Sequence, residues 1–400
     1  MIPWEPYKLE NIVDPYPMYQ WLRENDPVHK TINGDYVITK YQDVKQILND
    51  KRCDTGIRLD WLRENESQLS DQLNISFEPL KIALSAFPLF MNGDDHERIK
   101  KFMHGVWEVR DYSQLIDIII DRLAKQITLS DTFNFIETFA NKLPLHTISA
   151  ILGIDQNDLN ILMAETKKFF NIMDIYVSIS KLKSEVDSAI ILIAILENTF
   201  ELKFINPDES LISAILKKND EENNPLSKPE VLSVCFSFLA GGKETSSGLI
   251  GNAMYYLGKH TVWQSYLKEQ PEKYVNFINE IVRFDPPAQL SVRKNRNELH
   301  LGNRTIPKNS TLIVSMASAN RDEQETLHAN EFTIDSNLKN LSFGSGAHYC
   351  MGDWLGKSQA TALIKYFNEI YHEISVIGLP IYNSNLTIRT LSKLVLQVKP

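Results

Sequence analysis

Apolar residues recur at helical spacing over most of the chain. From about Pro15 to Lys273 the spacing is the alternating three- and four-residue step of amphipathic helices, and a strand-like piece at Asp35–Thr39 interrupts it early. After Arg283 the pattern changes to short strands and loops. The sequence therefore predicts a mainly α protein with small β-sheets.

One helix is predicted with defined ends. Ser227-Lys-Pro-Glu230 has the form of a capping box with proline in the first turn, and an apolar run follows to about Tyr256. At 1.5 Å per residue the helix is roughly 45 Å long, enough to cross a domain. Because it is apolar nearly all round, we expect it to be central and buried.

Length and composition favour one large domain. The chain has 400 residues, 43% of them hydrophobic, and shows no repeat or linker. The polar stretches 217–225 and 383–385 are short loops between periodic segments. We therefore predict a single domain over residues 1–400.

Charge and cysteine usage narrow the class of protein. A formal net charge of −9 argues against a nucleic-acid binder. Cys53, Cys235 and Cys350 are far apart and lack zinc-finger spacing, which suits a reducing cytosol and excludes a disulfide framework. We interpret Cys53 and Cys235 as structural. The first ten residues lack a signal-peptide pattern, and the longest apolar run, 189–196, is too short to span a bilayer, so we expect a soluble cytoplasmic protein without membrane contact.

The run Phe343-Gly-Ser-Gly-Ala-His-Tyr-Cys350-Met-Gly352 carries candidate metal chemistry. A cysteine in a glycine-padded turn that opens a helix meets unpaired amide N–H groups, which lower a thiol pKa to roughly 3.5–7.5 in favourable sites. Gly344, Gly346 and Gly352 allow close backbone approach to a flat partner, and Phe343 supplies an apolar wall. By itself the run fits either a thiolate metal ligand or a buried structural cysteine.

The same run resembles the haem-binding loop of the cytochrome P-450 family, Phe-x-x-Gly-x-x-x-Cys-x-Gly, at every fixed position. The resemblance implies a single-domain fold enclosing haem b (iron protoporphyrin IX), with Cys350 as the axial iron ligand. Thiolate ligation favours O–O cleavage. Two further segments, in the order and spacing of the family, make chance similarity untenable.

The first is Leu239-Ala-Gly-Gly-Lys-Glu-Thr-Ser-Ser247, a polar interruption of the long helix that resembles the family's oxygen-binding stretch. Gly241 and Gly242 would make room for O2 and a local widening of the helix, while Glu244 and Thr245 would hold water and deliver protons. A plain helix crossing built on small residues is the alternative. The sequence leaves the partner of Lys243 open: solvent, the proximal side or a substrate acid.

The second is Glu280-Ile-Val-Arg283, which takes the place of the family's buried Glu-x-x-Arg pair. The family often adds an arginine from the segment before the haem loop, but here Ser336 stands in that position. We expect a reorganised network with Asn337 or Asn340 as substitute partners.

The resemblance also implies cations for the two haem propionates. His348 and Arg293 match two family positions, and His96 and Lys100 match the family's Asp-x-x-x-His-x-x-x-Arg stretch with lysine in place of the arginine. For His96 an ordinary surface histidine is the alternative.

A mostly apolar substrate pocket is expected on the face opposite Cys350, although ordinary core packing must account for many of its residues. Its expected lining is Phe87, Leu89, Phe90, Phe170, Met173, Leu239, Ala240, Ala288, Gln289, Leu290, Leu391 and Ser392. The resemblance implies a basic face that docks an acidic electron donor, made by Arg98, Lys100, Lys101, Lys339 and Lys357. An ordinary solvated charge face is the alternative.

The expected activity is that of a haem-thiolate monooxygenase that hydroxylates or epoxidises a sizeable apolar molecule, such as a polyketide or another specialised metabolite. Its partners would be the substrate, O2, and a separate ferredoxin with its reductase. Whether the substrate is free or bound to an acyl carrier protein stays open. Two rivals remain: a peroxygenase that uses H2O2, and a haem sensor or carrier without turnover.

Overall fold

The computed structural model describes residues 4–107, 111–127, 132–177, 179–334 and 339–399. These residues form two compact units, each built from segments distant in sequence. The first comprises residues 1–53, 111–144 and 245–400, and the second comprises 54–110 and 145–244. As the sequence predicts, helices dominate and the sheets are small.

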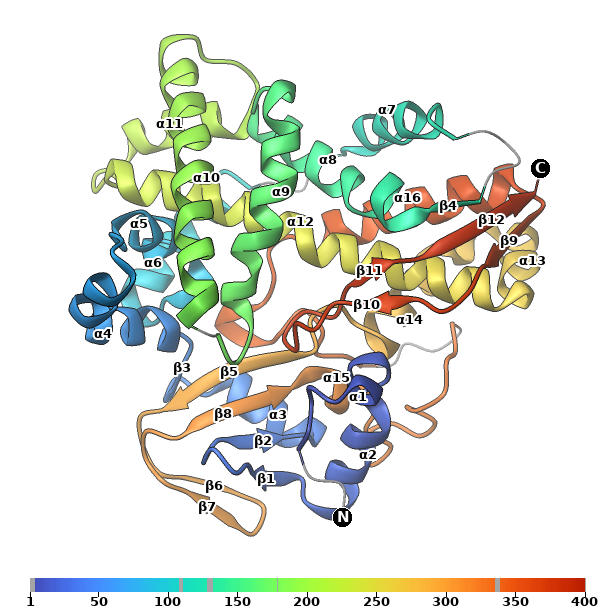
Figure 1. Ribbon diagram of the computed structural model, residues 1–400, viewed down its shortest axis with the longest axis horizontal. Helices are drawn as coiled ribbons and strands as arrows, with labels where there is room; N and C mark the ends of the chain where they lie inside the picture. Colours follow the sequence, from blue (N-terminus) through green and yellow to red (C-terminus); the bar gives the residue numbers. More distant parts are fainter. Residues whose placement is uncertain (1–3, 108–110, 128–131, 178, 335–338, 400) are drawn as a thin grey trace. The chain divides into compact units, whose positions relative to one another are not determined.

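The first unit contains the sheets. The largest has the order β1-β2-β8-β5-β3, with β2 and β8 parallel and β1/β2 and β5/β8 antiparallel. Its strands are β1 (Val28–Lys30), β2 (Tyr36–Ile38), β3 (Cys53–Asp54), β5 (Leu290–Asn295) and β8 (Thr311–Ser315). β2 confirms the strand predicted at Asp35–Thr39. Helix α3 (Tyr41–Asn49) lies beside this sheet (Figure 1), and its buried apolar side chains belong to the same hydrophobic core as the sheet.

Three smaller sheets complete the β structure of this unit. One is antiparallel with the order β4-β12-β9, and the others are two-stranded pairs, β6/β7 and β10/β11. The strands are β4 (Thr132–Asn134), β6 (Leu299–Leu301), β7 (Arg304–Ile306), β9 (Glu373–Val376), β10 (Ile381–Tyr382), β11 (Leu391–Lys393) and β12 (Val395–Lys399).

Helices surround these sheets and make up nearly all of the second unit. The remaining helices of the first unit are α1 (Leu9–Val13), α2 (Tyr16–Asn25), α7 (Ser113–Ala124), α13 (Thr261–Glu269), α14 (Tyr274–Phe284), α15 (Met316–Ala319) and α16 (Asp353–Ile370). The second unit has α4 (Ile57–Leu73), α5 (Glu78–Ser85), α6 (Gly93–His104), α9 (Leu159–Phe169), α10 (Ile179–Ile205) and α11 (Leu211–Glu221). Helices α8 (Lys142–Leu152) and α12 (Lys228–Lys259) contribute residues to both units.

Helix α12 is the long helix predicted from the capping box. The Ser227 backbone N–H donates to Glu230 Oε2 at 2.8 Å, and the box is completed by the Glu230 N–H at 3.5 Å from Ser227 Oγ. Residues 231–240 are all buried, as expected for a helix that is apolar all round. No helix among the described residues is long and apolar enough to cross a membrane.

Candidate active site

The loop that carries Cys350 is fixed by its own backbone. The Gly344 N–H donates to the Leu341 carbonyl at 2.8 Å, and the Cys350 N–H donates to the Phe343 carbonyl at 2.9 Å. A short 3₁₀ turn, Gly346–His348, lies between these two bonds. The chain therefore returns on itself and presents Cys350 at a fixed position.

Two glycines in this loop have backbone conformations that other residues rarely adopt. Gly344 has φ +76° and Gly346 has φ +67°. A Cβ at Gly346 would also lie 2.6 Å from Asn49 Oδ1, at the end of α3. Asn49 in turn donates to Ser345 Oγ at 2.9 Å, so α3 holds the turn from one side.

Cys350 differs from the other cysteines in exposure. Cys53 and Cys235 are buried, as predicted for structural cysteines, and burial raises the pKa of Cys235 to about 12. Cys350 is exposed and in no disulfide. Helix α16 has its N-cap at Gly352, so Cys350 lies two residues before the N-cap, in the turn that opens the helix. The loop bonds described above fix the backbone at Cys350.

Glu280 and Arg283 on α14 form the buried pair predicted from the sequence. Their side chains are 4% and 1% exposed, and Arg283 Nε and Nη2 donate to the two carboxylate oxygens at 2.8 and 2.6 Å. The remaining N–H groups of Arg283 donate to the carbonyls of Asn320, Ala329 and Glu331. The bidentate fork thus ties α14 to the segment that precedes the Cys350 loop.

The reorganised network expected around this pair uses backbone groups. The Thr333 N–H donates to Glu280 Oε1 at 2.7 Å. Ser336 and Asn337, which we considered for this network, lie outside the described residues. Asn340 accepts from the Ser342 N–H at 3.3 Å and so lies at the edge of the network.

Asn320 is a positioning residue that the sequence reasoning missed. Its side chain is buried, donates to the Arg283 carbonyl at 3.1 Å and to Ser342 Oγ at 2.7 Å, and accepts from the Leu341 N–H at 2.7 Å. These bonds connect the Glu280–Arg283 pair to the residues directly before Phe343. Nothing local in the sequence distinguishes this asparagine, because all three partners are distant along the chain.

The polar interruption of α12 does not widen the helix. Residues 228–259 are α-helical throughout, so the expected local widening is wrong. The two glycines have different surroundings: a Cβ at Gly242 would lie 3.3 Å from Ile148 on α8, whereas a Cβ at Gly241 would meet nothing within 4 Å. Gly242 therefore permits close helix packing, which was the alternative interpretation, and Gly241 leaves open space beside the helix.

The acid of this stretch is paired within its own helix. Lys243 and Glu244 are 1% and 8% exposed and form an ion pair. Thr245 follows on the same helix and is partly buried. The structure thus gives Lys243 a carboxylate partner, which the sequence had left open.

Arg293 on β5 is a buried cation. It is 3% exposed, and burial lowers its pKa to about 10. Its guanidinium donates to Ser291 Oγ and to the Val292 carbonyl, but within the described ranges it forms no ion pair. A buried guanidinium without a carboxylate fits an anionic group such as a haem propionate.

The other residues expected at the propionates have different environments. His96 is 3% exposed on α6, so it is not the surface histidine of the alternative interpretation. Burial, and then the charge of Lys100, lower the pKa of His96 below its usual range. Lys100 is partly buried one helical turn later, and His348 is partly buried in the Cys350 loop. Their role at a propionate remains a prediction.

Two of the expected pocket residues of the second unit, Phe87 and Phe90, belong to an aromatic cluster. Phe87 contacts Phe90 edge-on at 5.4 Å between ring centroids and Phe236 at 6.4 Å, and Phe169 contacts Phe236 at 4.7 Å. Phe170 and Ala240 are buried and Leu239 has no exposed surface, while Leu89 and Met173 are partly buried.

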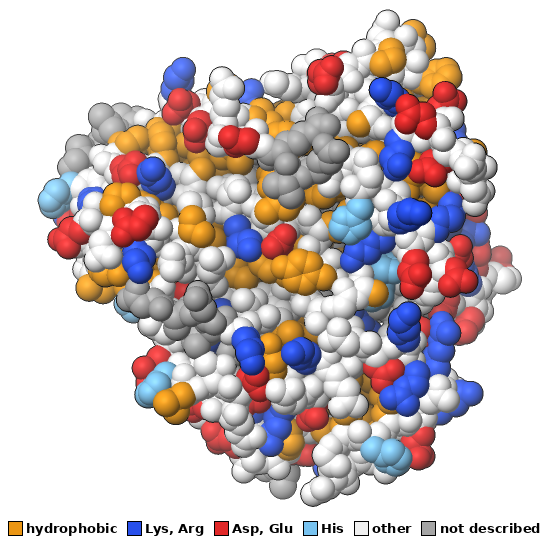
Figure 2. Space-filling model, turned by 180° about the vertical axis from the view of Figure 1, so that it is seen from behind, with side chains coloured by type: hydrophobic (Ala, Val, Ile, Leu, Met, Phe, Trp, Pro, Cys, Tyr) orange, Lys and Arg blue, Asp and Glu red, His pale blue; other side chains and the backbone are white. Residues whose placement is uncertain are grey.

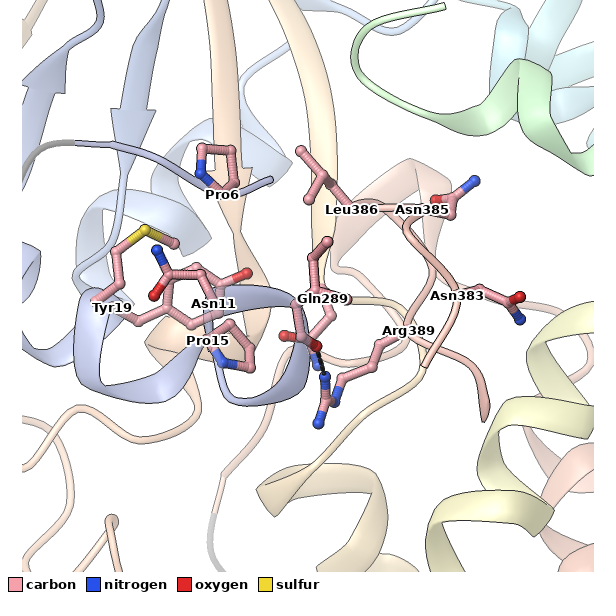
Figure 3. Close-up of a pocket in the computed structure, with 11 residues that line it drawn as sticks. Pro6, Asn11, Pro15, Tyr19, Gln289, Asn383, Asn385, Leu386 and Arg389 are labelled. Carbon is pink, nitrogen blue, oxygen red and sulfur yellow. Dashed lines mark hydrogen bonds between the residues drawn. The ribbon is translucent and has the colours of Figure 1, made fainter. Parts of the chain in front are cut away.

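Among the expected pocket residues of the first unit, Leu290 and Leu391 are buried, and Ala288 and Ser392 are partly buried. Gln289 lines a small cavity of about 20 Å³ with Tyr19 and Arg389 (Figure 3). Its Nε2 donates to the Pro286 carbonyl at 2.7 Å, whereas its buried Oε1 has no hydrogen-bond partner among the described residues. The cavity has room for about one water molecule. Lining of a substrate pocket by these residues stays a prediction.

The basic residues expected at a partner surface are largely neutralised. Lys339 pairs with Glu325 at 3.1 Å, Lys357 pairs with Asp353 at 3.2 Å, and Arg98 pairs with Glu230. On the face shown in Figure 2, basic and acidic side chains are interspersed. No group of three or more histidine, cysteine or acidic residues that could hold a metal occurs in the part of the chain that the structure describes.

Much of this site lies in a part of the chain that matches a protein-family model. The family model described as Cytochrome P450 matches residues 127–367, more than half of the chain. The match includes the polar stretch of α12, the Glu280–Arg283 pair and the Cys350 loop.

Similar proteins cover nearly the whole chain. The vitamin D(3) 25-hydroxylase of Pseudonocardia autotrophica is 25% identical over 398 residues, 97% of this chain and 94% of that one. The 6-deoxyerythronolide B hydroxylase of Saccharopolyspora erythraea is 25% identical over 368 residues, 88% and 87% of the two chains. The crystal structure of CalO2 has the same fold, with a TM-score of 0.90 at 22% identity over all of both chains.

Proposed function

Because this chain belongs to the cytochrome P450 family, we propose that it inserts one oxygen atom from O2 into a sizeable apolar small molecule, by hydroxylation or epoxidation. The chain is a cytochrome P450 monooxygenase, and its cofactor is haem b. Bound haem supplies the reductive activation of O2, for which thiolate ligation is suited.

The observation that carries the proposal is the Cys350 loop. Cys350 is exposed, and the backbone N–H groups of Cys350 and Gly344 donate to loop carbonyls. These bonds fix the backbone that carries Cys350. We assign Cys350 as the residue that would bind the iron, Phe343, Gly344 and Gly352 as residues that would contact the haem, and Gly241 as the residue that would leave room for O2.

We assign Arg293 as the main residue that would bind a haem propionate. Its buried guanidinium needs an anion, and the carboxylates of the described residues do not supply one. His348, His96 and Lys100 are the proposed additional contacts, with the neutral His96 acting through its ring N–H.

Glu244 and Thr245 are the proposed proton-handling residues. Glu244 is buried beside Lys243, and Thr245 follows on the same helix, so the stretch supplies an acid and an alcohol in sequence. An acid and an alcohol in this order favour O2-dependent turnover over a peroxygenase, which receives its oxygen from H2O2.

The proposed substrate is an apolar specialised metabolite such as a polyketide, free or attached to an acyl carrier protein. Two relatives at 25% identity are named as hydroxylases of vitamin D(3) and of 6-deoxyerythronolide B. The aromatic cluster around Phe236 agrees with a large apolar ligand. Electrons come from a ferredoxin and its reductase. Because several of the expected basic residues are paired, we expect their docking to depend only weakly on salt.

The proposal is tested with the haem-loaded protein. The reduced protein with CO should give the red-shifted absorbance of haem-thiolate, and Cys350→Ser should abolish it. A screen for compounds that convert the iron from low to high spin would then identify substrates.

With such a compound, a ferredoxin and reductase pair and ¹⁸O2, the product should carry one labelled oxygen. Labelled product formed only with H2¹⁸O2 would instead indicate a peroxygenase. Spectral responses to gases without product from any high-spin ligand would indicate a sensor.

A further inference from the structure

The carboxyl end of helix α5 is buried, so its backbone groups need hydrogen-bond partners from the chain itself. Ala83 and Ala86 have no exposed surface. The Ala83 carbonyl belongs to the last turn of α5, whose carbonyls lack donors within the helix. Ser233 on α12 is also fully buried, and its hydroxyl donates to the Ala83 carbonyl at 2.9 Å and accepts from the Ala86 N–H at 2.8 Å. One hydroxyl group therefore joins the end of α5 to α12.

The residue directly after this junction is Phe87, one of the expected pocket residues. Phe87 precedes Pro88, and a following proline disfavours helical backbone. Its φ of −87° and ψ of 110° are accordingly extended, and the chain then makes the 3₁₀ turn Pro88–Phe90. Local sequence thus sets the backbone conformation of Phe87, whereas the Ser233 hydroxyl sets the point from which the chain enters it.

The other end of this short segment is held by a second set of bonds. The Thr55 hydroxyl donates to the Met91 carbonyl at 3.0 Å, and the Thr55 N–H donates to Asn92 Oδ1 at 2.9 Å. Residues 86–92 are therefore attached at both ends to parts of the chain that are distant in sequence. A segment held in this way has little freedom to shift.

The ring of Phe87 packs against the same face of α12 that carries Ser233. Phe236 follows Ser233 by three residues, so the two side chains lie on one side of the helix. Phe87 contacts Phe236 at 6.4 Å and Phe90 at 5.4 Å between ring centroids, in both cases edge-on. Loss of the Ser233 hydroxyl would therefore first affect the position of Phe87.

We propose that Ser233 is a positioning residue that fixes the Phe87 ring in the substrate pocket and so determines how tightly the pocket holds an apolar ligand. This inference rests on the proposed function and adds to it a residue that controls ligand selectivity through another residue. The physical cause is preorganisation, because a wall that is already fixed does not have to be ordered when the ligand binds.

The test compares Ser233→Ala with a matched control, Ser237→Ala, in the haem-loaded protein. Ser237 lies one turn further along α12 and is also buried, but its hydroxyl donates to the Val234 carbonyl of its own helix at 2.8 Å. The probes are imidazole and 4-phenylimidazole, which both bind haem iron through an imidazole nitrogen and change its absorbance. The ratio of their dissociation constants therefore isolates the contribution of the apolar phenyl group.

We expect Ser233→Ala to weaken the binding of 4-phenylimidazole about 3- to 10-fold, which is the effect of ordering about one side chain on binding. Imidazole should bind as to the wild type, and Ser237→Ala should leave both dissociation constants unchanged. The proposal is overturned by an unchanged ratio in Ser233→Ala or by an equal loss for the two probes. It is also overturned if Ser237→Ala lowers the affinity for 4-phenylimidazole as much as Ser233→Ala does.

A double substitution tests whether Ser233 acts through Phe87. If it does, Ser233→Ala should not weaken 4-phenylimidazole further in a Phe87→Ala background, so the double variant should bind this probe like Phe87→Ala alone. An additional loss in the double variant would show that Ser233 acts through a different residue and would refute the assignment.

Hydrogen exchange gives a readout that requires no ligand. Peptides that cover residues 84–92 should exchange faster in Ser233→Ala than in the wild type or in Ser237→Ala, because the Ala86 N–H loses the Ser233 hydroxyl. Exchange at the wild-type rate would contradict the proposal. If no donor pair yields product, the proposed monooxygenase function fails, whereas the probe ratio and hydrogen exchange still decide the role of Ser233.

Discussion

Replacing Arg283 with lysine is the most direct test of how the Cys350 loop is held. All five N–H groups of Arg283 are used: two bind Glu280, and three bind the carbonyls of Asn320, Ala329 and Glu331. Lysine keeps the charge but has three N–H donors on one nitrogen and cannot form the fork. At least two of the five acceptor contacts must be lost.

The magnitude follows from burial. Glu280 and Arg283 are 4% and 1% exposed in their side chains, so water does not replace the lost contacts. Each buried acceptor left unpaired costs about 1–3 kcal/mol, so two lost contacts cost about 2–6 kcal/mol. We therefore expect Arg283→Lys to lower the free energy of unfolding by about 2–6 kcal/mol.

The assay is urea unfolding of the haem-loaded protein, followed by far-UV circular dichroism, together with the fraction of reduced protein that gives the haem-thiolate CO spectrum. The matched control is Lys365→Ala, which breaks an exposed pair with Glu369 in the same unit, where the side chains are 49% and 46% exposed. That control should change stability by less than about 1 kcal/mol. A loss in Arg283→Lys no larger than in the control, with the CO spectrum intact, would refute the idea that this network holds the loop.

Three further substitutions probe the same structure. Asn320→Asp replaces the two hydrogen bonds donated by the Asn320 amide with repulsion between the new carboxylate and the Arg283 carbonyl and Ser342 hydroxyl oxygens. We therefore expect the free energy of unfolding in urea to fall by about 2–4 kcal/mol and a smaller fraction of the protein to give the haem-thiolate spectrum. Unchanged values of both quantities would disprove the positioning role of Asn320. Gly346→Ala places a Cβ on a residue with φ +67° and 2.6 Å from Asn49 Oδ1. We expect this change to lower the free energy of unfolding by at least about 1–2 kcal/mol in the same assay. A variant as stable as the wild type would show that the loop adapts to the added methyl group. Burial raises the pKa of Glu230, but hydrogen bonds from Ser227 and the ion pair with Arg98 together lower it by more, so the pKa lies below its usual value. The Glu230 carboxylate therefore stabilises the folded state at pH values above the usual carboxyl pKa. This stabilisation is lost as pH falls through the lowered pKa. Glu230→Gln should therefore cost about 1 kcal/mol near pH 7 and progressively less in acid, and a pH-independent difference between the two proteins would contradict this assignment.

The sequence by itself determined the class of fold, the long helix and the thiolate loop. These features depend on neighbours along the chain: apolar spacing for the helices, Ser227 and Glu230 for the start of α12, and the fixed spacing of Phe343, Gly346 and Cys350. The Glu280–Arg283 contact is of the same kind, since a three-residue step on a helix brings the two side chains together.

Tertiary structure alone decided what surrounds these groups. Asn320 became visible as a positioning residue only when the fold brought Arg283, Leu341 and Ser342 to its amide. The burial of Arg293 without a carboxylate and the meeting of Lys243 with Glu244 likewise depend on which elements exclude water. Hydrogen bonding and desolvation act between atoms that are close in space, and sequence patterns report closeness only over a few residues along the chain.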